Sequence, residues 1–378
     1  MSIRTLINPN VGEVFDGPPP DRLPLQFHRR LPGYEETPLV DAPRLAEAFG
    51  VGKVFVKDES SRLGLPAFKV LGASWAVYRA LEGRLGEDLS HGEAIEDLKA
   101  RLEPLRPLSL VAATDGNHGR AVARVARMLG LGARIFVPGD MVAARREAIA
   151  GEGAEVVVVD GGYDEAVERS AEAEGLLISD TSWPGYEHVP SWVIEGYSTM
   201  LWEIEEELIS RGEAGPDLVV VQVGVGAFAA AVARHFRRLD TTAHPKLVAI
   251  EPARADCLFQ SVSAGRLVSV PGPHDSIMSG LNCGRPSLVA WPILSRSMDV
   301  LVAVDDESAR EAMRLAARTG IVSGEAGAAG LGGLLQLLHS RDCGEARRLL
   351  GVNEDTRILV FNTEGATDPD AYRRVVAE

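Results

Sequence analysis

The sequence predicts an α/β fold, with mostly parallel twisted sheets flanked by helices and divided between two lobes. Two observations support this fold class. Short apolar runs rich in β-branched residues recur from about residue 50 onwards, and helix-like segments lie between them. Buried parallel strands have such runs because helices cover both faces of their sheet. The expected strands are Lys53–Lys57, Leu108–Ala112, Ala133–Val137, Glu155–Val159, Leu218–Val223, Leu247–Glu251, Asp299–Val304 and Arg357–Asn362.

Helices are expected between these strands, because apolar residues recur there at spacings of three and four. One such stripe, which Gly130 ends, consists of Ala121, Val122, Val125, Ala126 and Leu129. The first fifty residues are instead rich in proline and are expected to form an arm laid over the body. The prolines of this arm are Pro18, Pro19, Pro20, Pro24, Pro32 and Pro38.

Composition narrows the class of protein. The content of 46% apolar and 25% charged residues is typical of a globular protein, and a net charge of −15 disfavours nucleic-acid binding, which uses basic patches. The N-terminus lacks the apolar run of a signal peptide. The most apolar stretch, residues 218–233, contains Gln222 and two glycines, so it does not resemble a membrane span. We therefore expect a cytoplasmic protein with neither a nucleic-acid nor a membrane partner.

The cysteines predict neither a disulfide framework nor a metal site. The chain contains Cys257, Cys283 and Cys343, and no Cys/His cluster has the spacing of zinc ligands. Cys257 and Cys283 could meet in the fold, but two buried thiols are the favoured interpretation.

Lys69 is the most informative single residue, because the chain has only five lysines against thirty-four arginines. It follows Phe68 in an apolar segment and lies just before an expected helix. A lysine in a desolvated pocket loses its proton readily and becomes a nucleophile for a carbonyl carbon, whereas arginine stays protonated. On this residue alone, a lysine that snorkels at a helix start is the better explanation.

The first unusual loop, Thr114-Asp115-Gly116-Asn117-His118-Gly119, leads from an expected strand into a helix. N–H groups at a helix start bind carboxylates and phosphates, and the amide of Asn117 can contact a phenolate-type oxygen. From the residue type alone, Asp115 is explained equally well as a helix N-cap.

The second loop, Gln222-Val223-Gly224-Val225-Gly226-Ala227-Phe228, also joins a strand to a helix. Its two glycines let the backbone approach a phosphate closely at a positive helix end. Dinucleotide-binding proteins share this pattern, and Glu251 ends the next strand, so a nicotinamide-dependent oxidoreductase is an alternative.

The third loop begins Asn362-Thr363-Glu364-Gly365 and follows the last expected strand. A neutral hydroxyl or amide there could face a ring nitrogen. For this loop alone, a polar turn is the better explanation.

Together, these motifs resemble the fold type II pyridoxal-phosphate enzymes, the tryptophan synthase β-subunit superfamily, and within it the diaminopropionate ammonia-lyases. The resemblance extends along nearly the whole body of the chain. Besides the three loops, it rests on Val56–Ser60, Phe68–Gly72, Asp180–Trp183, Gly196-Tyr197, Glu251-Pro252, Ala255–Cys257, Ser276–Gly284 and Ser323–Gly327.

The resemblance implies a larger lobe, residues 1–71 and 196–378, and a smaller inserted lobe, residues 72–195, in each subunit of a homodimer. It also implies pyridoxal 5'-phosphate as the cofactor, bound covalently by Lys69. The other implied cofactor contacts are Phe68, Asn117 at the ring oxygen, the loop Gly224, Val225, Gly226, Ala227 and Phe228 at the phosphate, Glu325 at a helix start, and Thr363 in preference to Asn362 at the ring nitrogen.

The implied reaction is the α,β-elimination of 2,3-diaminopropionate to pyruvate and two ammonia. Asp115 and Asp180 would pair with the β-ammonium of this substrate, while Thr114, Gly116 and His118 complete its site. Lys69 and Asp115 would remove the α-proton from opposite faces, so that one site accepts both enantiomers. If Asp115 is only a cap, a serine/threonine-type dehydratase is the alternative. A non-catalytic pyridoxal-phosphate-binding protein is another.

Overall fold

The computed structural model describes residues 3–12, 20–86, 89, 95–238 and 244–377, so Pro18 and Pro19 lie outside the described residues. The chain divides into two compact units. Unit 1 comprises Met1–Pro20, Glu36–Ser61 and Met200–Glu378, and unit 2 comprises Asp21–Glu35 and Arg62–Thr199. The two lobes expected from the sequence stay a prediction, and their boundaries differ from this division at residues 21–35, 62–71 and 196–199.

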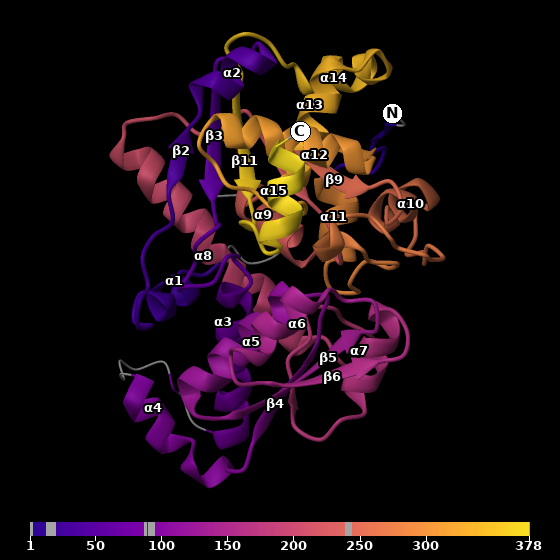
Figure 1. Ribbon diagram of the computed structural model, residues 1–378. Coiled ribbons are helices and arrows are strands. Elements are labelled where there is room, and N and C mark those ends of the chain that lie inside the picture. Colours follow the sequence, from indigo (N-terminus) through magenta and orange to yellow (C-terminus); the bar gives the residue numbers. More distant parts are fainter. Residues whose placement is uncertain (1–2, 13–19, 87–88, 90–94, 239–243, 378) are drawn as a thin grey trace. The chain divides into compact units, whose positions relative to one another are not determined.

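Unit 1 is built on a seven-stranded sheet, as far as the described residues show, with the strand order β1-β10-β9-β8-β11-β3-β2 (Figure 1). Its five central strands are parallel, and each lies within one residue of an expected strand at either end. The strands are β1 (Arg4–Ile7), β2 (Leu39–Asp41), β3 (Lys53–Asp58), β8 (Leu218–Gln222), β9 (Lys246–Pro252), β10 (Val300–Val304) and β11 (Arg357–Asn362).

The N-terminal fifty residues contribute more than the expected arm. Their segments β1 and β2 pair antiparallel with β10 and β3, and they form the two edges of the unit 1 sheet. The prediction of a plain arm was wrong here because both strands are short, and their pairing depends on partners far away in the sequence.

Helices cover both faces of the unit 1 sheet. On one face packs α13, toward which Val220, Ile250 and Val360 point. On the other face, the ring centroids of Phe361 and of Phe228 in α9 are 5.0 Å apart. The helices are α2 (Pro43–Phe49), α9 (Ala227–Phe236), α10 (Cys257–Ala264), α11 (Trp291–Ser297), α12 (Asp306–Arg318), α13 (Ala329–His339), α14 (Gly344–Leu350) and α15 (Pro369–Ala377).

Unit 2 has a smaller, parallel sheet, which is four-stranded in the described residues and has the order β6-β5-β4-β7. The strands are β4 (Ser109–Ala113), β5 (Gly132–Pro138), β6 (Glu155–Val159) and β7 (Leu176–Leu177). The helices are α1 (Leu23–His28), α3 (Val70–Leu85), α4 (Ile95–Arg101), α5 (Asn117–Leu129), α6 (Ala143–Ala150) and α7 (Tyr163–Ala171), and α8 (His188–Ser210) continues from unit 2 into unit 1.

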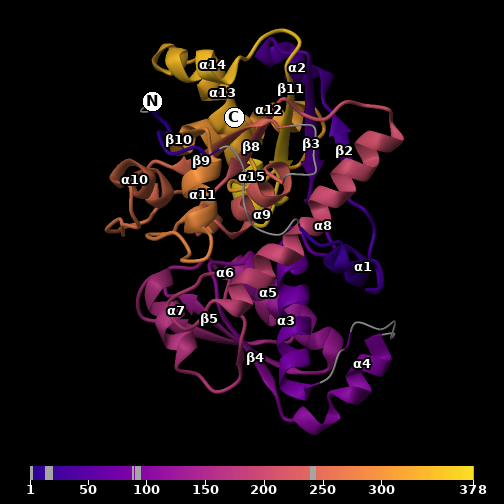
Figure 2. The same ribbon diagram turned by 180° about the vertical axis from the view of Figure 1, so that it is seen from behind.

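Two glycines bring α3 and α8 unusually close together within unit 2, where both views show the helices side by side (Figure 2). A Cβ on Gly72 would lie 2.6 Å from the ring of Tyr197, and a Cβ on Gly196 would lie 2.5 Å from the carbonyl oxygen of Leu71. Only glycine permits this approach, which fixes the start of α3, where Lys69 lies.

In both sheets, the loops that carry the predicted site residues follow the carboxyl ends of neighbouring strands. β4 and β7 are adjacent, so the loops that carry Asp115 and Asp180 lie at one edge of the unit 2 sheet. β8 and β11 are adjacent in unit 1, so the Gly224 and Thr363 loops also share an edge. Ligands of open α/β sheets bind at such edges. In the part of the chain that the structure describes, no helix is both long and apolar enough to cross a bilayer.

Candidate active site

Lys69 forms an ion pair with Asp180 in unit 2. Lys69 directly precedes the first residue of α3, and its Nζ donates a hydrogen bond to Asp180 Oδ2 at 2.7 Å. The Lys69 side chain is 20% exposed and that of Asp180 is 8% exposed, so the pair is largely shielded from water. The Nζ of Lys69 also lies 5.7 Å from the ring centroid of Phe68, and the ring centroids of Phe68 and Tyr197 are 4.8 Å apart.

The ion pair reverses the pKa change that the sequence predicted for Lys69. Burial by itself lowers the pKa of this ammonium, as expected, but the Asp180 carboxylate, with smaller contributions from Tyr197 and Asp115, raises it above its ordinary value. In turn, burial by itself raises the pKa of Asp180, and the Lys69 ammonium outweighs burial and lowers it. The expected deprotonated lysine was therefore wrong for this arrangement, in which Lys69 is a cation.

Asp115 is not the N-cap of α5. The capping position is Gly116, whose φ of +152° and ψ of −82° are open only to glycine, and its N–H donates to Thr114 Oγ1 at 2.9 Å. The alternative explanation of Asp115 as a capping residue is therefore wrong. A Cβ on Gly116 would lie 3.3 Å from Cδ of Arg145 in α6, so a cationic side chain packs against this loop.

The half-buried Asp115 carboxyl group has a perturbed pKa. Burial raises the pKa of Asp115 to about 6, although the nearby cations Lys69 and Arg145 act in the opposite direction. A carboxyl group with such a pKa is an acceptable proton acceptor near neutral pH, because it is ionised there and still basic.

Two further side chains face Asp180. Tyr163, the first residue of α7, donates its hydroxyl to Asp180 Oδ1 at 3.3 Å, and His118 Nδ1 lies 3.9 Å from Asp180 Oδ2. Burial lowers the pKa of His118, and its Nε2 hydrogen-bonds the carbonyl of Ile178 at 2.8 Å. The neutral ring therefore carries its proton on Nε2, which leaves Nδ1 as an acceptor directed at Asp180. Neither Tyr163 nor Arg145 belongs to a recognisable motif, so neither was predicted from the sequence.

In unit 1, the Gly224–Phe228 loop leads from β8 into α9. Gly226 is the N-cap of α9, and its φ of +98° favours glycine. A Cβ there would also lie 2.6 Å from Leu294 Cδ1. Among the described residues, no group accepts a hydrogen bond from the N–H of Gly224, Val225 or Gly226.

Gln222, the last residue of β8, links this loop to Thr363 by a hydrogen bond. Gln222 Nε2 donates to Thr363 Oγ1 at 2.8 Å, so the Thr363 hydroxyl keeps its own hydrogen for another acceptor. The amide nitrogen of Asn362 instead donates to Asp58 Oδ1 at 2.8 Å and to Val322 O at 2.9 Å. Gln222 is a buried amide in an apolar strand, and this exception to the apolar pattern is visible in the sequence.

Two acidic residues of unit 1 differ from expectation. Glu325 lies in a turn, and α13 begins only at Ala329, so Glu325 does not open a helix. Glu251, which supported the nicotinamide alternative, accepts hydrogen bonds from the N–H groups of Leu258 and Phe259 at 2.8 and 2.7 Å. The carboxyl group of Glu251 is thus hydrogen-bonded to the first turn of α10.

The cysteines Cys257 and Cys283 are both free, buried thiols.

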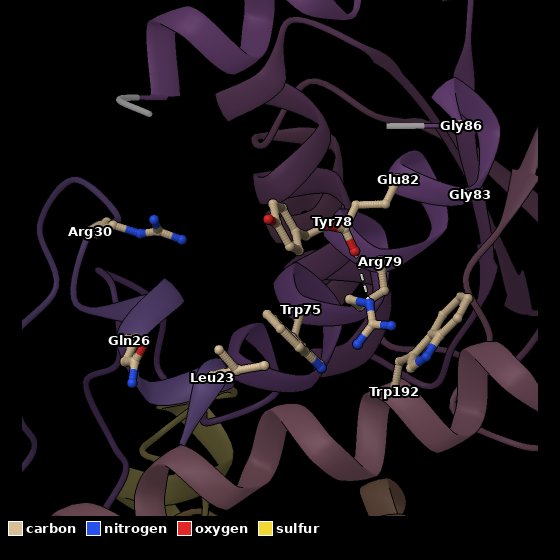
Figure 3. A pocket seen from close by; sticks show the side chains of 10 residues that line it. All are labelled: Leu23, Gln26, Arg30, Trp75, Tyr78, Arg79, Glu82, Gly83, Gly86 and Trp192. Carbon is tan, nitrogen blue, oxygen red and sulfur yellow. Dashed lines mark ion pairs between the residues drawn. The ribbon is translucent and has the colours of Figure 1, made fainter. Parts of the chain in front are cut away.

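A groove of about 530 Å³ lies elsewhere on unit 2, along α1, α3 and α8 (Figure 3). In it, Arg79 pairs with Glu82 at 2.9 Å, and its guanidinium lies 5.5 Å from the ring centroids of both Trp75 and Trp192. Among the described residues that line the groove, none is a site residue predicted from the sequence.

Comparison with known proteins identifies the family of the chain. A family model described as "Pyridoxal-phosphate dependent enzyme" matches residues 30–355. The chain belongs to this family of pyridoxal-phosphate-dependent enzymes. Family membership confirms the predicted cofactor, and it replaces the nicotinamide alternative.

Two relatives of this pyridoxal-phosphate-dependent enzyme carry the same name, and one of them has two solved structures that resemble the chain. The chain is 36% identical to the diaminopropionate ammonia-lyase of Salmonella typhimurium over 385 residues, which cover 98% of the chain and 93% of that relative. The holo diaminopropionate ammonia-lyase of Escherichia coli has a TM-score of 0.91 at 33% identity and covers 99% of this chain and 96% of its own. The structure of the same E. coli enzyme in complex with an aminoacrylate-PLP azomethine reaction intermediate has a TM-score of 0.90 at 33% identity. The match covers 99% of this chain and 97% of the E. coli chain. The similarity confirms the fold type II class.

The residues of each unit suit pyridoxal phosphate. In unit 1, the N–H groups of Gly224, Val225 and Gly226 are available as donors at the start of a ten-residue helix, where a phosphate is favoured. In unit 2, Lys69 carries a primary amine, which is the kind of group that the aldehyde of this cofactor requires.

Proposed function

We propose that this pyridoxal-phosphate-dependent enzyme catalyses the α,β-elimination of 2,3-diaminopropionate to pyruvate and two molecules of ammonia. The observation that carries the proposal is the cluster of two carboxylates, Asp115 and Asp180, around the Lys69 ammonium. An amino-acid substrate brings its own carboxylate, so two further carboxylates nearby are unfavourable unless the substrate also brings a cation. The β-ammonium of diaminopropionate is such a cation, whereas the hydroxyl of serine or threonine is neutral. The similarity to diaminopropionate ammonia-lyases supports the same substrate.

The proposed cofactor contacts follow the roles that the family resemblance implies for individual residues. In unit 2, Lys69 would hold the cofactor covalently, with Phe68 beside it and Asn117 at the ring oxygen. In unit 1, the Gly224–Phe228 loop would bind the phosphate and Thr363 would donate to the ring nitrogen. Glu325, buried in its turn, would lie near the ring. When bound, pyridoxal phosphate withdraws electrons from the α-carbon of an attached amino acid and makes the α-proton acidic.

Lys69 and Asp115 would act as the two proton acceptors. Nζ of Lys69 would remove the α-proton of one enantiomer in its neutral amine form, after losing the proton that it carries in the ion pair with Asp180. The carboxylate of Asp115, on a separate loop, would remove the α-proton of the other enantiomer. As the α-proton leaves, the electrons of the Cβ–N bond pass to the nitrogen of the β-ammonium, which departs as neutral ammonia. The 2-aminoacrylate released into water then hydrolyses to pyruvate and the second ammonia.

Asp180 and His118 would bind the β-ammonium before it leaves. Asp180 supplies the negative charge, and Nδ1 of the buried, neutral His118 supplies an acceptor 3.9 Å away from Asp180 Oδ2. Two acceptors at this separation suit one cationic donor placed between them. Thr114 and Gly116 would contact the substrate carboxylate from the same loop as Asp115.

A steady-state comparison of substrates tests the proposed function. The holoenzyme is assayed with L- and D-diaminopropionate, L-serine and L-threonine, and pyruvate and ammonia are both quantified. We expect kcat/KM for diaminopropionate to exceed that for serine by at least about tenfold, which is about 1.4 kcal/mol of transition-state stabilisation. The ratio of ammonia to pyruvate should be two. Equal or faster turnover of serine would support the dehydratase alternative, and no turnover of any substrate would support a binding protein.

We also propose that the enzyme is a cytoplasmic homodimer. The composition, the acidic net charge of −15 and the family resemblance support this assignment. Sedimentation equilibrium would test the assembly, with a mass of twice 40.4 kDa expected. A monomer at micromolar concentration would contradict it.

A further inference from the structure

A strained turn precedes Lys69. Arg62 and Leu65 pair across it, with N–H to carbonyl distances of 2.8 and 2.9 Å, and the two central residues both have positive φ: +50° for Leu63 and +72° for Gly64. Within the described residues, Leu63 is the only residue other than glycine with positive φ. Such turns favour Asn-Gly at the centre, so leucine is a poor choice for this backbone.

Arg124 of α5 holds this turn. Its NH1 donates to the carbonyl of Leu63 at 2.9 Å, and a Cβ on Gly64 would lie 3.3 Å from the same NH1. The guanidinium therefore lies against the turn and satisfies the carbonyl of its strained residue.

Glu152 fixes Arg124 in this position. The carboxylate of Glu152 accepts from Nε of Arg124 at 2.6 Å and from its NH2 at 2.9 Å, which is a bidentate pair. Glu152 is only 4% exposed, and Arg120 and Arg127 contact it from the same face of α5. The three arginines hold the pKa of Glu152 below its ordinary value, although burial acts in the opposite direction.

The turn is linked to Lys69 by a short buried segment. Only residues 66–68 separate Leu65 from Lys69, and Leu65, Ala67 and Phe68 are buried. Because a packed segment does not absorb displacements freely, a shift of the turn is passed on to the backbone of Lys69. The N-terminus of α5, meanwhile, adjoins the loop of Asp115.

We propose that Arg124 and Glu152 are positioning residues that hold the Leu63–Gly64 turn and thereby set the backbone of Lys69 relative to the Asp115 loop. The inference rests on the proposed function for the roles of Lys69 and Asp115. The loop of Asp115, one proposed proton acceptor, thus leads into the N-terminus of α5. Two turns later, the same helix carries Arg124, which positions Lys69, the other proposed acceptor.

The test combines Arg124→Gln with a second substitution that should repair the turn. We compare wild type, Arg124→Gln, Leu63→Asn, the double variant and Arg127→Gln. Arg127→Gln is the matched control, because Arg127 also contacts Glu152 but is half exposed and extends to Gly151 rather than to the turn. Amide hydrogen exchange of residues 62–69 is measured in the cofactor-free chains, and kcat and KM for diaminopropionate are measured in the holoenzymes.

We expect Arg124→Gln to speed exchange in residues 62–69 and to lower kcat by on the order of tenfold or more, with KM changed less than about threefold. Adding Leu63→Asn should restore both, because Asn-Gly adopts this turn without the arginine. A general loss of stability in α5 would not be repaired by Leu63→Asn. Arg127→Gln should resemble wild type.

Unchanged exchange and kcat in Arg124→Gln would overturn the proposal, as would an unrepaired double variant when the single Leu63→Asn chain is active. If Leu63→Asn alone impairs the enzyme, Leu63→Gly replaces it in the same comparison. Failure of the proposed function is distinguishable: wild type would not turn over diaminopropionate, while the exchange data would still decide whether Arg124 holds the turn.

Discussion

Replacing Asp115 with asparagine tests the two proton acceptors directly. The substitution keeps the size of the side chain and removes its basicity. Since Gly116 is the N-cap of α5, the change removes no capping hydrogen bond from the helix, so little loss of stability is expected. If Asp115 is the acceptor for one enantiomer only, the loss of activity must be unequal between D- and L-diaminopropionate.

The expected size of the effect follows from the role and the pKa of Asp115. Removing a general base costs on the order of 10²-fold or more, which is about 2.7 kcal/mol of activation free energy. The pKa of Asp115 is raised to about 6, so two pH units above this value about 99% of the groups are ionised and able to accept a proton. We therefore expect a loss of about 10²-fold towards one enantiomer, D in our assignment, and partial survival towards the other.

The assay is the steady-state release of pyruvate from each pure enantiomer near pH 8, with saturating cofactor. A pH profile supplies a second observable: in wild type, turnover of the affected enantiomer should fall about tenfold per pH unit below pH 6, as Asp115 takes up a proton. In the asparagine variant this acidic limb should disappear from the residual activity. Small and equal losses on both enantiomers would show that Asp115 is structural and would refute the two-acceptor mechanism.

Three other variants give distinct results. Lys69→Ala should abolish multiple turnover and the visible absorbance band that borohydride removes from the wild-type holoenzyme, and a normal spectrum would contradict the assignment of Lys69. Gly226→Ala places a Cβ 2.6 Å from Leu294 Cδ1 at a φ of +98°, so a fluorescence titration should show the Kd for pyridoxal phosphate rising about tenfold or more, whereas an unchanged Kd would exclude this loop as the phosphate site. Arg145→Gln removes a cation that lowers the pKa of Asp115, so the acidic limb should move to higher pH, and a shift to lower pH would contradict the electrostatic account.

The predictions from sequence succeeded where the determining interactions are local. β3, β6 and β11 begin and end within a residue of the expected positions, because a buried parallel strand needs a continuous apolar run whatever its neighbours are. The glycine loop before α9 was also predictable, because glycine readily adopts a positive φ, as Gly226 does here. β1 and β2 were not predicted, because three or four residues acquire strand structure only from the edge with which they pair.

The sequence by itself thus determined the fold class and the loops that carry polar groups, because periodicity and glycine placement are local properties of the chain. The cofactor was indicated by the resemblance of its motifs to a known family. Only the tertiary structure decided which charges meet. It places Asp180 at 2.7 Å from Lys69, 111 residues away along the chain, and Arg124 at the carbonyl of Leu63. The direction of the Lys69 pKa change was decided there too, because burial lowers this pKa and the neighbouring carboxylates raise it, and no local sequence pattern shows which carboxylates are near.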